Sequence, residues 1–452
     1  MTLHAMITQQ ALAVHGNLPP ARPTGLEFDS RKIKPGHVFV ALEGSESDGH
    51  DFIAQAAEKG AACAIVSRKQ NVDICQIVVE DPLAFLFGWA EAERASWKGK
   101  TVIGLTGSVG KTSHKEMLKV LCEAMGDTHA TSGNYNNKLG LSHTILNTPD
   151  TADYVILELG ISEVGEMQEL TQIAKPDFAY ITNIHPCHLE GLNDVDTIAR
   201  EKSKVYSTLK ETGTAFINCS DAFAPTFLKA SKHCHCVKLS DALTLINDSI
   251  TVNSHGIASF NVKQGQLTQH CQLAIPGRHQ VDNAYAMMVV ANHLGLSLSE
   301  CASQIQTVKP SKGRMAVHLE QSSQALIIDD TYNASPQAMR AAIKSLKSIS
   351  RSKKIAVIGD MEELGESSDH WHKEIGAWLN EEGINTLFTL GEKAKLAISK
   401  FKGQATEFTS IDHLSATIQA QLDQDTVVLI KASRSMQLEH CVDQLLCNKV
   451  KE

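Results

Sequence analysis

The sequence predicts an α/β protein of three domains, and three observations support this. Short apolar runs, typical of buried strands, recur along the chain and alternate with stretches of helical character. One of these runs leads directly into a glycine-rich turn. The chain has 452 residues, more than one domain usually holds, and its 42% apolar and 21% charged content is ordinary for a globular protein.

The first domain is expected over residues 1–82, as a small α/β unit. Apolar runs predict buried strands at 38–42, at the end of 60–66 and at 76–80. Two polar loops, at residues 29–32 and 43–51, lie next to these strands. Such loops commonly bind ligands, but plain solvated turns would have the same composition. Both interpretations therefore stay open for this domain.

The middle domain, residues 83–310, is expected to contain a mostly parallel sheet covered by helices on both faces. Its predicted strands lie at 101–106, 154–157, 178–182 and 215–218, and helical stretches alternate with strands between about 100 and 300. The carboxyl ends of parallel strands meet at one edge of a sheet. We therefore expect the turn after Thr106, Glu158 and the segment 183–188 to converge there.

The last domain, residues 311–452, repeats the pattern and predicts a second, Rossmann-like α/β unit. Strands are expected at 325–328, 354–358 and 426–430, and each is followed by a charged or glycine-containing segment. Ser335 is expected to cap a helix whose first position is Pro336.

The glycine-rich turn is of the phosphate-loop type. It comprises Gly107, Ser108, Val109, Gly110, Lys111, Thr112 and Ser113, and a helix is expected to begin near Lys111. Backbone N–H groups and a helix N-terminus together favour phosphate, Lys111 can reach the β- and γ-phosphates, and the Thr112 hydroxyl can bind Mg²⁺. Leu105 occupies a position where the full pattern has glycine. The alternative is a turn that merely links strand to helix.

Glu158 and His188 are candidate metal ligands. Glu158 ends an apolar strand beside the phosphate loop, where a carboxylate suits Mg²⁺. His188 could help Glu158 hold a second cation, although Mg²⁺ prefers oxygen and a histidine ligand indicates a mixed or Mn²⁺-tolerant site. Two cations would need more negative charge than one carboxylate supplies.

Composition excludes several classes of protein. The net charge of −9 argues against a nucleic-acid binder that works through a basic patch. The chain has no apolar run of about 18 residues, so no integral membrane segment is expected, and its N-terminus shows no secretory signal. Eleven cysteines without disulfide spacing fit the reducing cytoplasm.

A series of ordered motifs resembles the Mur ligase family, ATP-dependent amide-forming enzymes of bacterial cell-wall precursor synthesis. The resemblance covers all three predicted domains. Its motifs are residues 106–112, 133–140, 158–160, 183–190, 277–284, 313–314 and 329–333.

The resemblance implies a site for ATP and two Mg²⁺ ions. The residues implied for ATP are Gly107, Ser108, Val109, Gly110, Lys111, Thr112 and Ser113, with Asn283 at the adenine, Arg314 against the phosphates and Asp330 at the ribose. The metal ligands implied are Thr112, Glu158, His188 and Lys202. Lys202 matches the lysine that the family carbamylates, which would supply the missing negative charge. On sequence alone, Lys202 would instead be an exposed helix lysine. The catalytic set implied is Lys111, Lys202, His188, Glu158 and Arg314.

The resemblance also implies the substrates. Segments 330–336, 359–365 and 431–435 resemble the members that add D-alanyl-D-alanine to UDP-N-acetylmuramoyl-tripeptide through an acyl phosphate. The substrate residues implied are Ser30 and Arg31 for the uridine diphosphate, and Asn134, Asn137, Asn333, Lys431 and Arg434. A cytoplasmic monomer is expected. The alternatives are another amino-acid-adding member of the family, including folylpolyglutamate synthase, or a non-catalytic phosphate-loop switch.

Overall fold

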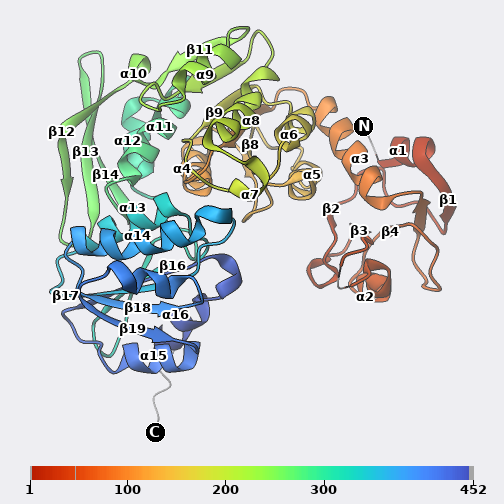
Figure 1. Cartoon of the computed structure of the whole chain (residues 1–452). Helices are drawn as coiled ribbons and strands as arrows, with labels where there is room; N and C mark the ends of the chain where they lie inside the picture. Colours follow the sequence, from red (N-terminus) through yellow and green to blue (C-terminus); the bar gives the residue numbers. More distant parts are fainter. Residues whose placement is uncertain (1–2, 46, 447–452) are drawn as a thin grey trace.

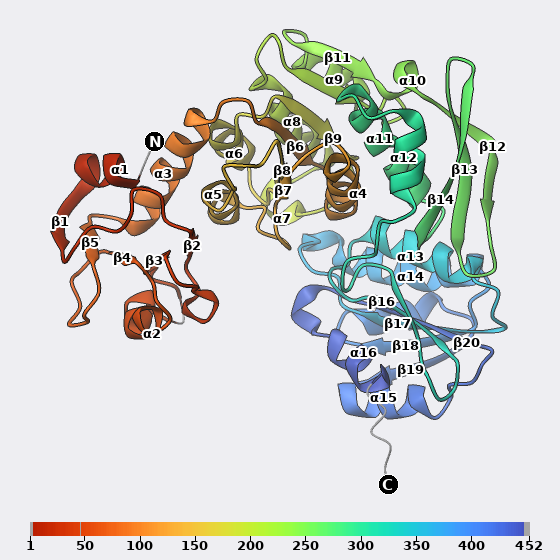
Figure 2. The ribbon, with the colours of Figure 1, turned by 180° about the vertical axis from the view of Figure 1, so that it is seen from behind.

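The computed structural model describes residues 3–45 and 47–446 and has three α/β domains. Met1 and Thr2, from the segment examined for a secretory signal, and Glu46, from the polar loop 43–51, lie outside the described residues. The three domains form an arch, with the middle domain between the N-terminal and C-terminal domains (Figures 1 and 2). Within the described ranges, no helix has both the length and the apolar character required to cross a bilayer.

The N-terminal domain is built on a five-stranded sheet of order β1-β5-β4-β3-β2, in which only the β1–β5 pair is antiparallel. The predicted strands correspond to β3, β4 and β5. Its elements are α1 (Leu3–Gln10), β1 (Ala11–His15), β2 (Gly25–Glu27), η1 (Ser30–Lys32), β3 (His37–Val40), η2 (Gly49–Phe52), α2 (Ile53–Glu58), β4 (Cys63–Val66), β5 (Gln76–Val79) and α3 (Pro82–Ser96).

Helix α3 connects the first two domains. It begins at Pro82, and the Asp81 carboxylate accepts hydrogen bonds from the backbone N–H groups of Leu83 and Ala84. Phe85 belongs to the core of the N-terminal domain, whereas Ala90 belongs to a core of the middle domain. The proposed boundary at residue 82 therefore falls where this connecting helix begins.

The middle domain contains a six-stranded, wholly parallel sheet of order β11-β10-β9-β6-β8-β7. Strand β6 lies between β8 and β9, so their carboxyl ends meet at one edge, as predicted. Its elements up to β11 are β6 (Thr101–Thr106), α4 (Lys111–Glu123), β7 (Thr128–Ala130), α5 (Lys138–Leu146), β8 (Tyr154–Glu158), α6 (Glu166–Ala174), β9 (Phe178–Ile181), α7 (Leu189–Leu192), α8 (Val195–Ser207), β10 (Thr214–Ile217), α9 (Ala224–Ala230) and β11 (His235–Lys238).

The expectation of alternating helices and strands up to residue 300 was wrong for one segment. After α10 (Leu239–Ala242), the chain forms an antiparallel sheet of β12 (Thr244–Val252), β13 (Ile257–Gln264) and β14 (Leu267–Pro276). This sheet shares a core with α11 (Gln280–His293), α12 (Leu298–Ile305) and α4. Burial alternates along β13, as in a sheet with only one covered face, which differs from the continuous apolar runs of parallel strands.

The C-terminal domain has a six-stranded sheet of order β15-β16-β20-β17-β18-β19, with only β15 antiparallel. Ser335 occupies the predicted capping position of α13, but its side chain makes no capping hydrogen bond. The elements are β15 (Ala316–Leu319), β16 (Leu326–Asp330), α13 (Pro336–Ser348), β17 (Lys353–Gly359), η3 (Gly365–Ser367), α14 (Ser368–Glu381), β18 (Thr386–Leu390), η4 (Ala394–Lys400), β19 (Gln404–Phe408), α15 (Ile411–Gln419), β20 (Thr426–Lys431), η5 (Arg434–Met436) and α16 (Glu439–Leu446).

Candidate active site

The glycine-rich turn joins β6 to α4, and the helix begins at Lys111 as predicted. Gly107 has φ 148°, and a Cβ atom at this position would lie 1.9 Å from Oγ1 of Thr182. Gly110, the residue before the helix, has φ 81°. Both positions therefore require glycine, and the turn exposes backbone N–H groups at a helix N-terminus, where an anion is favoured.

The segment that follows β9 braces this turn. The Asn183 side chain accepts a hydrogen bond from the N–H of Val109 (3.0 Å) and donates one to its carbonyl (3.0 Å). The Ser108 hydroxyl donates to the carbonyl of His185 over 2.9 Å. Sequence reasoning placed 183–188 near the loop but did not assign Asn183 a role. Its position in a motif next to the predicted strand end was the available signal.

Lys111 folds back over the loop that precedes it. Its Nζ donates to the carbonyl of Gly107 over 2.8 Å, and its side chain is half-buried. The cation thus lies beside the backbone N–H groups of the turn. This arrangement can stabilise negative charge on a phosphate chain.

Glu158, at the end of β8, is buried beside the loop. Its Oε2 accepts a hydrogen bond from the Thr112 hydroxyl (3.0 Å), and its Oε1 accepts one from the Asn136 side chain (2.9 Å). The buried Lys115 cation lies 3.9 Å from Oε2 and donates to the carbonyl of Thr131 over 2.6 Å. Lys115 and Asn136 were not among the predicted site residues. Lys115 follows Lys111 by one helical turn, and this spacing was the signal for it.

His188 contacts the C-terminal domain, which the sequence did not predict. Its Nδ1 is 2.6 Å from Oε2 of Glu363, a contact at ion-pair distance. His188 nonetheless lines the same cavity as Glu158 and the loop. The contact lowers the pKa of Glu363 below its usual range.

Lys202 is fully buried in α8, so the alternative of an exposed helix lysine is wrong. Its Nζ makes no hydrogen bond. Burial, and then the charge of Lys111, lower the pKa of Lys202 to about 7. A substantial fraction of this amine is therefore neutral near neutral pH, the form in which an amine is nucleophilic.

Asp330 and Lys431 are paired across neighbouring strands at the carboxyl edge of the C-terminal sheet. They are register partners in β16 and β20, and Nζ of Lys431 lies 2.6 Å from Oδ2 of Asp330. Lys431 also donates to the carbonyl of Asn333 over 2.7 Å. Burial raises the pKa of Asp330, and the Lys431 cation opposes that shift.

Asn283 and Arg314 approach the cavity from the middle domain and from the start of the C-terminal domain. The Asn283 side chain donates to Oε1 of Gln280 over 2.9 Å. The Arg314 guanidinium lies 4.0 Å from the centre of the Tyr332 ring, a cation–π contact. Both contacts hold their side chains at the cavity wall.

One cavity of about 990 Å³ between the middle and C-terminal domains brings most predicted residues together. Those that line it are Ser108, Val109, Gly110, Lys111, Thr112, Ser113, Asn134, Asn137, Glu158, His188, Asn283, Arg314, Asp330, Asn333 and Lys431. Ser30, Arg31, Gly107, Lys202 and Arg434 are not part of this lining.

The remaining predicted residues lie elsewhere. Ser30 and Arg31 are in η1 of the N-terminal domain, where the Ser30 hydroxyl bonds Gln55 and the exposed Arg31 pairs with Asp29 at 2.9 Å. Arg434 follows β20 and pairs with Glu439 at 2.6 Å.

Comparison with known proteins assigns most of the chain to one family. Residues 22–96 match the family described as "Mur ligase family, catalytic domain", residues 105–291 the "Mur ligase middle domain", and residues 313–434 the "Mur ligase, glutamate ligase domain". The chain is 31% identical to the UDP-N-acetylmuramoyl-tripeptide–D-alanyl-D-alanine ligase of Escherichia coli, covering 92% of each chain. The chain belongs to the Mur ligase family. The ligase of the same description from Bacillus subtilis is also 31% identical, covering 93% of each chain.

Solved structures agree with this Mur ligase in all three domains. MurF from Acinetobacter baumannii superimposes with a TM-score of 0.86 at 30% identity, covering 98% of each chain. MurF ligase from Thermotoga maritima in complex with ADP gives a TM-score of 0.78 at 27% identity, covering 93% of this chain and 97% of that one.

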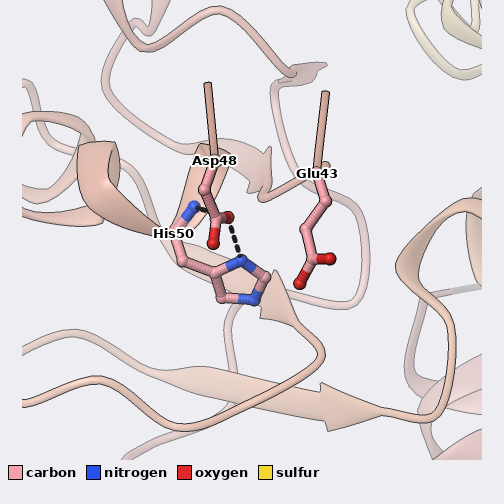
Figure 3. Close-up of side chains that lie close together, drawn as sticks. All are labelled: Glu43, Asp48 and His50. Atoms are coloured by element: carbon pink, nitrogen blue, oxygen red, sulfur yellow. Dashed lines mark hydrogen bonds and ion pairs between the residues drawn. The ribbon is translucent and has the colours of Figure 1, made fainter. Parts of the chain in front are cut away.

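A separate cluster in the N-terminal domain of this Mur ligase resembles a metal site but does not fit one. Glu43, Asp48 and His50 form the only group of three potential ligands within residues 3–45 and 47–446 that lie close enough for one ion (Figure 3). Nδ1 of His50 contacts Asp48 at 2.6 Å, and Nε2 accepts the N–H of Ser67 at 3.1 Å. Arg68 pairs with both carboxylates. Both ring nitrogens of His50 and the carboxylates of Glu43 and Asp48 therefore already have partners in the protein. The cluster is better explained as a set of contacts that stabilises the polar loop between β3 and η2.

Proposed function

We propose that this Mur ligase joins D-alanyl-D-alanine to UDP-N-acetylmuramoyl-tripeptide at the expense of ATP. The products are ADP, phosphate and UDP-N-acetylmuramoyl-pentapeptide, a peptidoglycan precursor. One observation carries the proposal: relatives described as this ligase in several bacteria match more than nine-tenths of the chain. The nucleotide-type loop at the interdomain cavity gives the activity a physical site.

ATP is proposed to bind with its phosphates on the turn at Gly107–Ser113. Lys111 and the backbone N–H groups face the transferring phosphate, and Arg314 supplies a second cation. Asn283 is assigned to the adenine and Asp330 to the ribose. The Thermotoga maritima relative is described in complex with ADP, which supports nucleotide binding in this fold.

Thr112, Glu158, His188 and Lys202 are proposed to hold two Mg²⁺ ions. The side chains fit this role, since a hydroxyl and a carboxylate already meet at 3.0 Å, and the buried Lys202 amine, whose charge interacts with that of Lys111, makes no hydrogen bond. Carbamylation would form a bond from the Lys202 nitrogen to the carbon of CO₂ and release one proton to solvent. The resulting anion supplies the charge that a second cation needs. When bound, Mg²⁺ would neutralise charge on the phosphate oxygens.

The chemistry requires activation of a carboxylate, which is a poor electrophile. Transfer of the γ-phosphoryl group to the tripeptide carboxylate gives an acyl phosphate and ADP. The amine of D-alanyl-D-alanine then attacks the acyl carbon, and the tetrahedral intermediate collapses to the amide and phosphate. Lys111 and the loop N–H groups stabilise charge on the transferring oxygens. Water would hydrolyse the acyl phosphate, so the cavity should close between the two domains before transfer.

The remaining assignments follow from the same family. Ser30 and Arg31 are proposed to contact the uridine diphosphate, and Asn134, Asn137, Asn333, Lys431 and Arg434 are proposed to contact the peptide substrates. We propose domain limits of 1–82, 83–310 and 311–452, and a cytoplasmic monomer whose site is built from one chain.

Two other functions are separated from this one by a single assay. Phosphate release from ATP is measured with the UDP-substrate alone, with the amine alone and with both. A ligase requires both substrates for turnover. A non-catalytic phosphate-loop switch would show no phosphate release that depends on the two substrates, and another Mur-family ligase would require a different amine.

A further inference from the structure

Glu363, in the C-terminal domain, reaches across the cavity to His188 in the middle domain. Its Oε2 lies 2.6 Å from Nδ1 of His188, and its carbonyl accepts the N–H of Leu189 over 3.2 Å. Both Glu363 and His188 line the large cavity. A side-chain contact and a backbone hydrogen bond therefore join the two walls of the cavity at one point.

The backbone is held in an uncommon conformation on both sides of this contact. His188 has φ 50° and Glu363 has φ 61°, values that non-glycine residues rarely adopt. Such conformations persist where the surrounding structure enforces them, and they gather at ligand sites and switch regions. The two residues that meet across the cavity are thus presented by specially shaped turns.

Glu363 is fixed to the rest of the C-terminal domain. The N–H of Met361 donates to Nε2 of His372 over 2.9 Å, and the N–H of Glu362 donates to Oγ of Ser433 over 2.9 Å. These bonds tie the segment before Glu363 to α14 and to the end of β20. Glu363 must therefore move with its domain.

A second contact between the domains lies on the side of the β12–β14 sheet. The N–H of Ser350 donates to the carbonyl of Ser254 over 2.8 Å. In both views this sheet and α7 reach the C-terminal domain at different places (Figures 1 and 2). Of these two contacts between the domains, only the one at His188 involves a proposed metal ligand.

We propose that Glu363 is a positioning residue for His188, so that the metal site reaches full affinity only when the C-terminal domain is in place. The inference rests on the proposed role of His188 as a metal ligand. A ligating histidine almost always gives its other ring nitrogen to a carboxylate, a carbonyl or water, which fixes the ring. With Nδ1 at Glu363, Nε2 of His188 remains for the ion. Closure and metal binding are thereby coupled.

The experiment measures Mn²⁺ affinity by electron paramagnetic resonance on the full chain with a non-hydrolysable ATP analogue. Removal of such a partner typically weakens metal binding 10- to 100-fold, so Glu363→Ala should bind Mn²⁺ at least about tenfold more weakly. Glu363→Gln keeps an oxygen acceptor for the Nδ1–H group of His188, so its Mn²⁺ affinity should fall less than that of Glu363→Ala. Glu366→Ala removes an exposed carboxylate from the adjacent η3 turn and should leave the affinity unchanged.

His188→Ala separates this inference from the proposed function. If His188→Ala weakens Mn²⁺ binding but neither Glu363 variant does, the role of Glu363 is overturned while the metal site stands. If His188→Ala has no effect on Mn²⁺ binding, His188 is not a metal ligand. The proposed ligand role of His188 and the positioning role of Glu363 then both fail, and the assay of substrate-dependent phosphate release tests the ligase activity separately. The double variant His188→Ala/Glu363→Ala should bind Mn²⁺ no more weakly than His188→Ala alone, because Glu363 acts through His188. An additional loss in the double variant would contradict positioning.

Discussion

The Thr112 hydroxyl donates a hydrogen bond to Oε2 of Glu158 over 3.0 Å. This bond joins the first turn of α4 to the end of β8, the strand beside β6 in the parallel sheet. Asn136 holds the other carboxylate oxygen at 2.9 Å. Two oxygen donors thus meet next to the glycine-rich turn, in a buried place suited to a hard cation that bridges a phosphate.

Lys111→Ala should abolish most turnover without unfolding the protein. The side chain is half-buried and its 2.8 Å hydrogen bond goes only to the loop, so its loss leaves the core intact. Losing one such donor costs about 2.7–4 kcal/mol of transition-state stabilisation, roughly 10²- to 10³-fold in kcat. Phosphate release measures the effect, with Lys119→Ala on the same helix as the control. Near-normal turnover by Lys111→Ala would show that Lys111 does not stabilise the transferring phosphate.

Lys202 should become carbamylated more fully as the pH rises through about 7. Only the neutral amine reacts with CO₂, and burial lowers the pKa of Lys202 so that the neutral form dominates above that pH. Carbon-13 NMR with labelled CO₂ at constant partial pressure would follow a carbamate signal that increases from pH 6 to 8. The signal should be absent in Lys202→Ala. A signal that is identical in the variant would assign it to another amine.

Lys115→Met should destabilise the middle domain. The substitution removes a buried cation 3.9 Å from Glu158 and a donor to the carbonyl of Thr131. Removing one partner of a buried pair costs about 3–5 kcal/mol, because the other charge remains buried. Denaturant unfolding should show a lower midpoint than for Lys119→Met, whose side chain is 40% exposed. Equal midpoints for the two variants would mean that the contacts of the buried Lys115 cation do not stabilise the fold.

The central strands of the parallel sheets could be predicted because their signal is local. They are continuous apolar runs, and β6, β8 and β20 were found within a residue of their ends, whereas β7, β11, β18 and β19 of the same sheets were not predicted. The β12–β14 sheet was missed because its strands are half-exposed and their apolar residues alternate with polar ones. The phosphate-type turn was also predictable, since strand, glycines and helix start are contiguous in the sequence.

The contacts of the site could not be predicted in the same way. Burial of Lys202 and Lys115 depends on elements far apart in the chain, and charged side chains carry no sequence signal of burial. The contact between His188 and Glu363 joins two domains, so neither residue indicates the other. The motifs located Asn136 and Asn183 near the site, but they did not predict the hydrogen bonds that these two side chains make.

Arg434→Ala should raise the KM for the dipeptide more than the KM for ATP. Lys431 already pairs with Asp330 at 2.6 Å, whereas the Arg434 side chain is 63% exposed and retains donors beyond its contact with Glu439. A hydrogen bond to a charged group contributes about 1.5–3 kcal/mol, so the KM for the dipeptide should rise about tenfold or more. Arg340→Ala, in the same domain, is the control. An equal rise for ATP and dipeptide would argue against a carboxylate anchor.

The choice of amine tests the central claim most directly. ADP release is measured with UDP-N-acetylmuramoyl-tripeptide, ATP and, in turn, D-alanyl-D-alanine, D-alanine, L-lysine and diaminopimelate. The proposed function predicts that D-alanyl-D-alanine supports the fastest turnover and that omission of either substrate stops it. Faster turnover with any of the single amino acids would contradict the proposed function and assign the chain to a different member of the Mur ligase family.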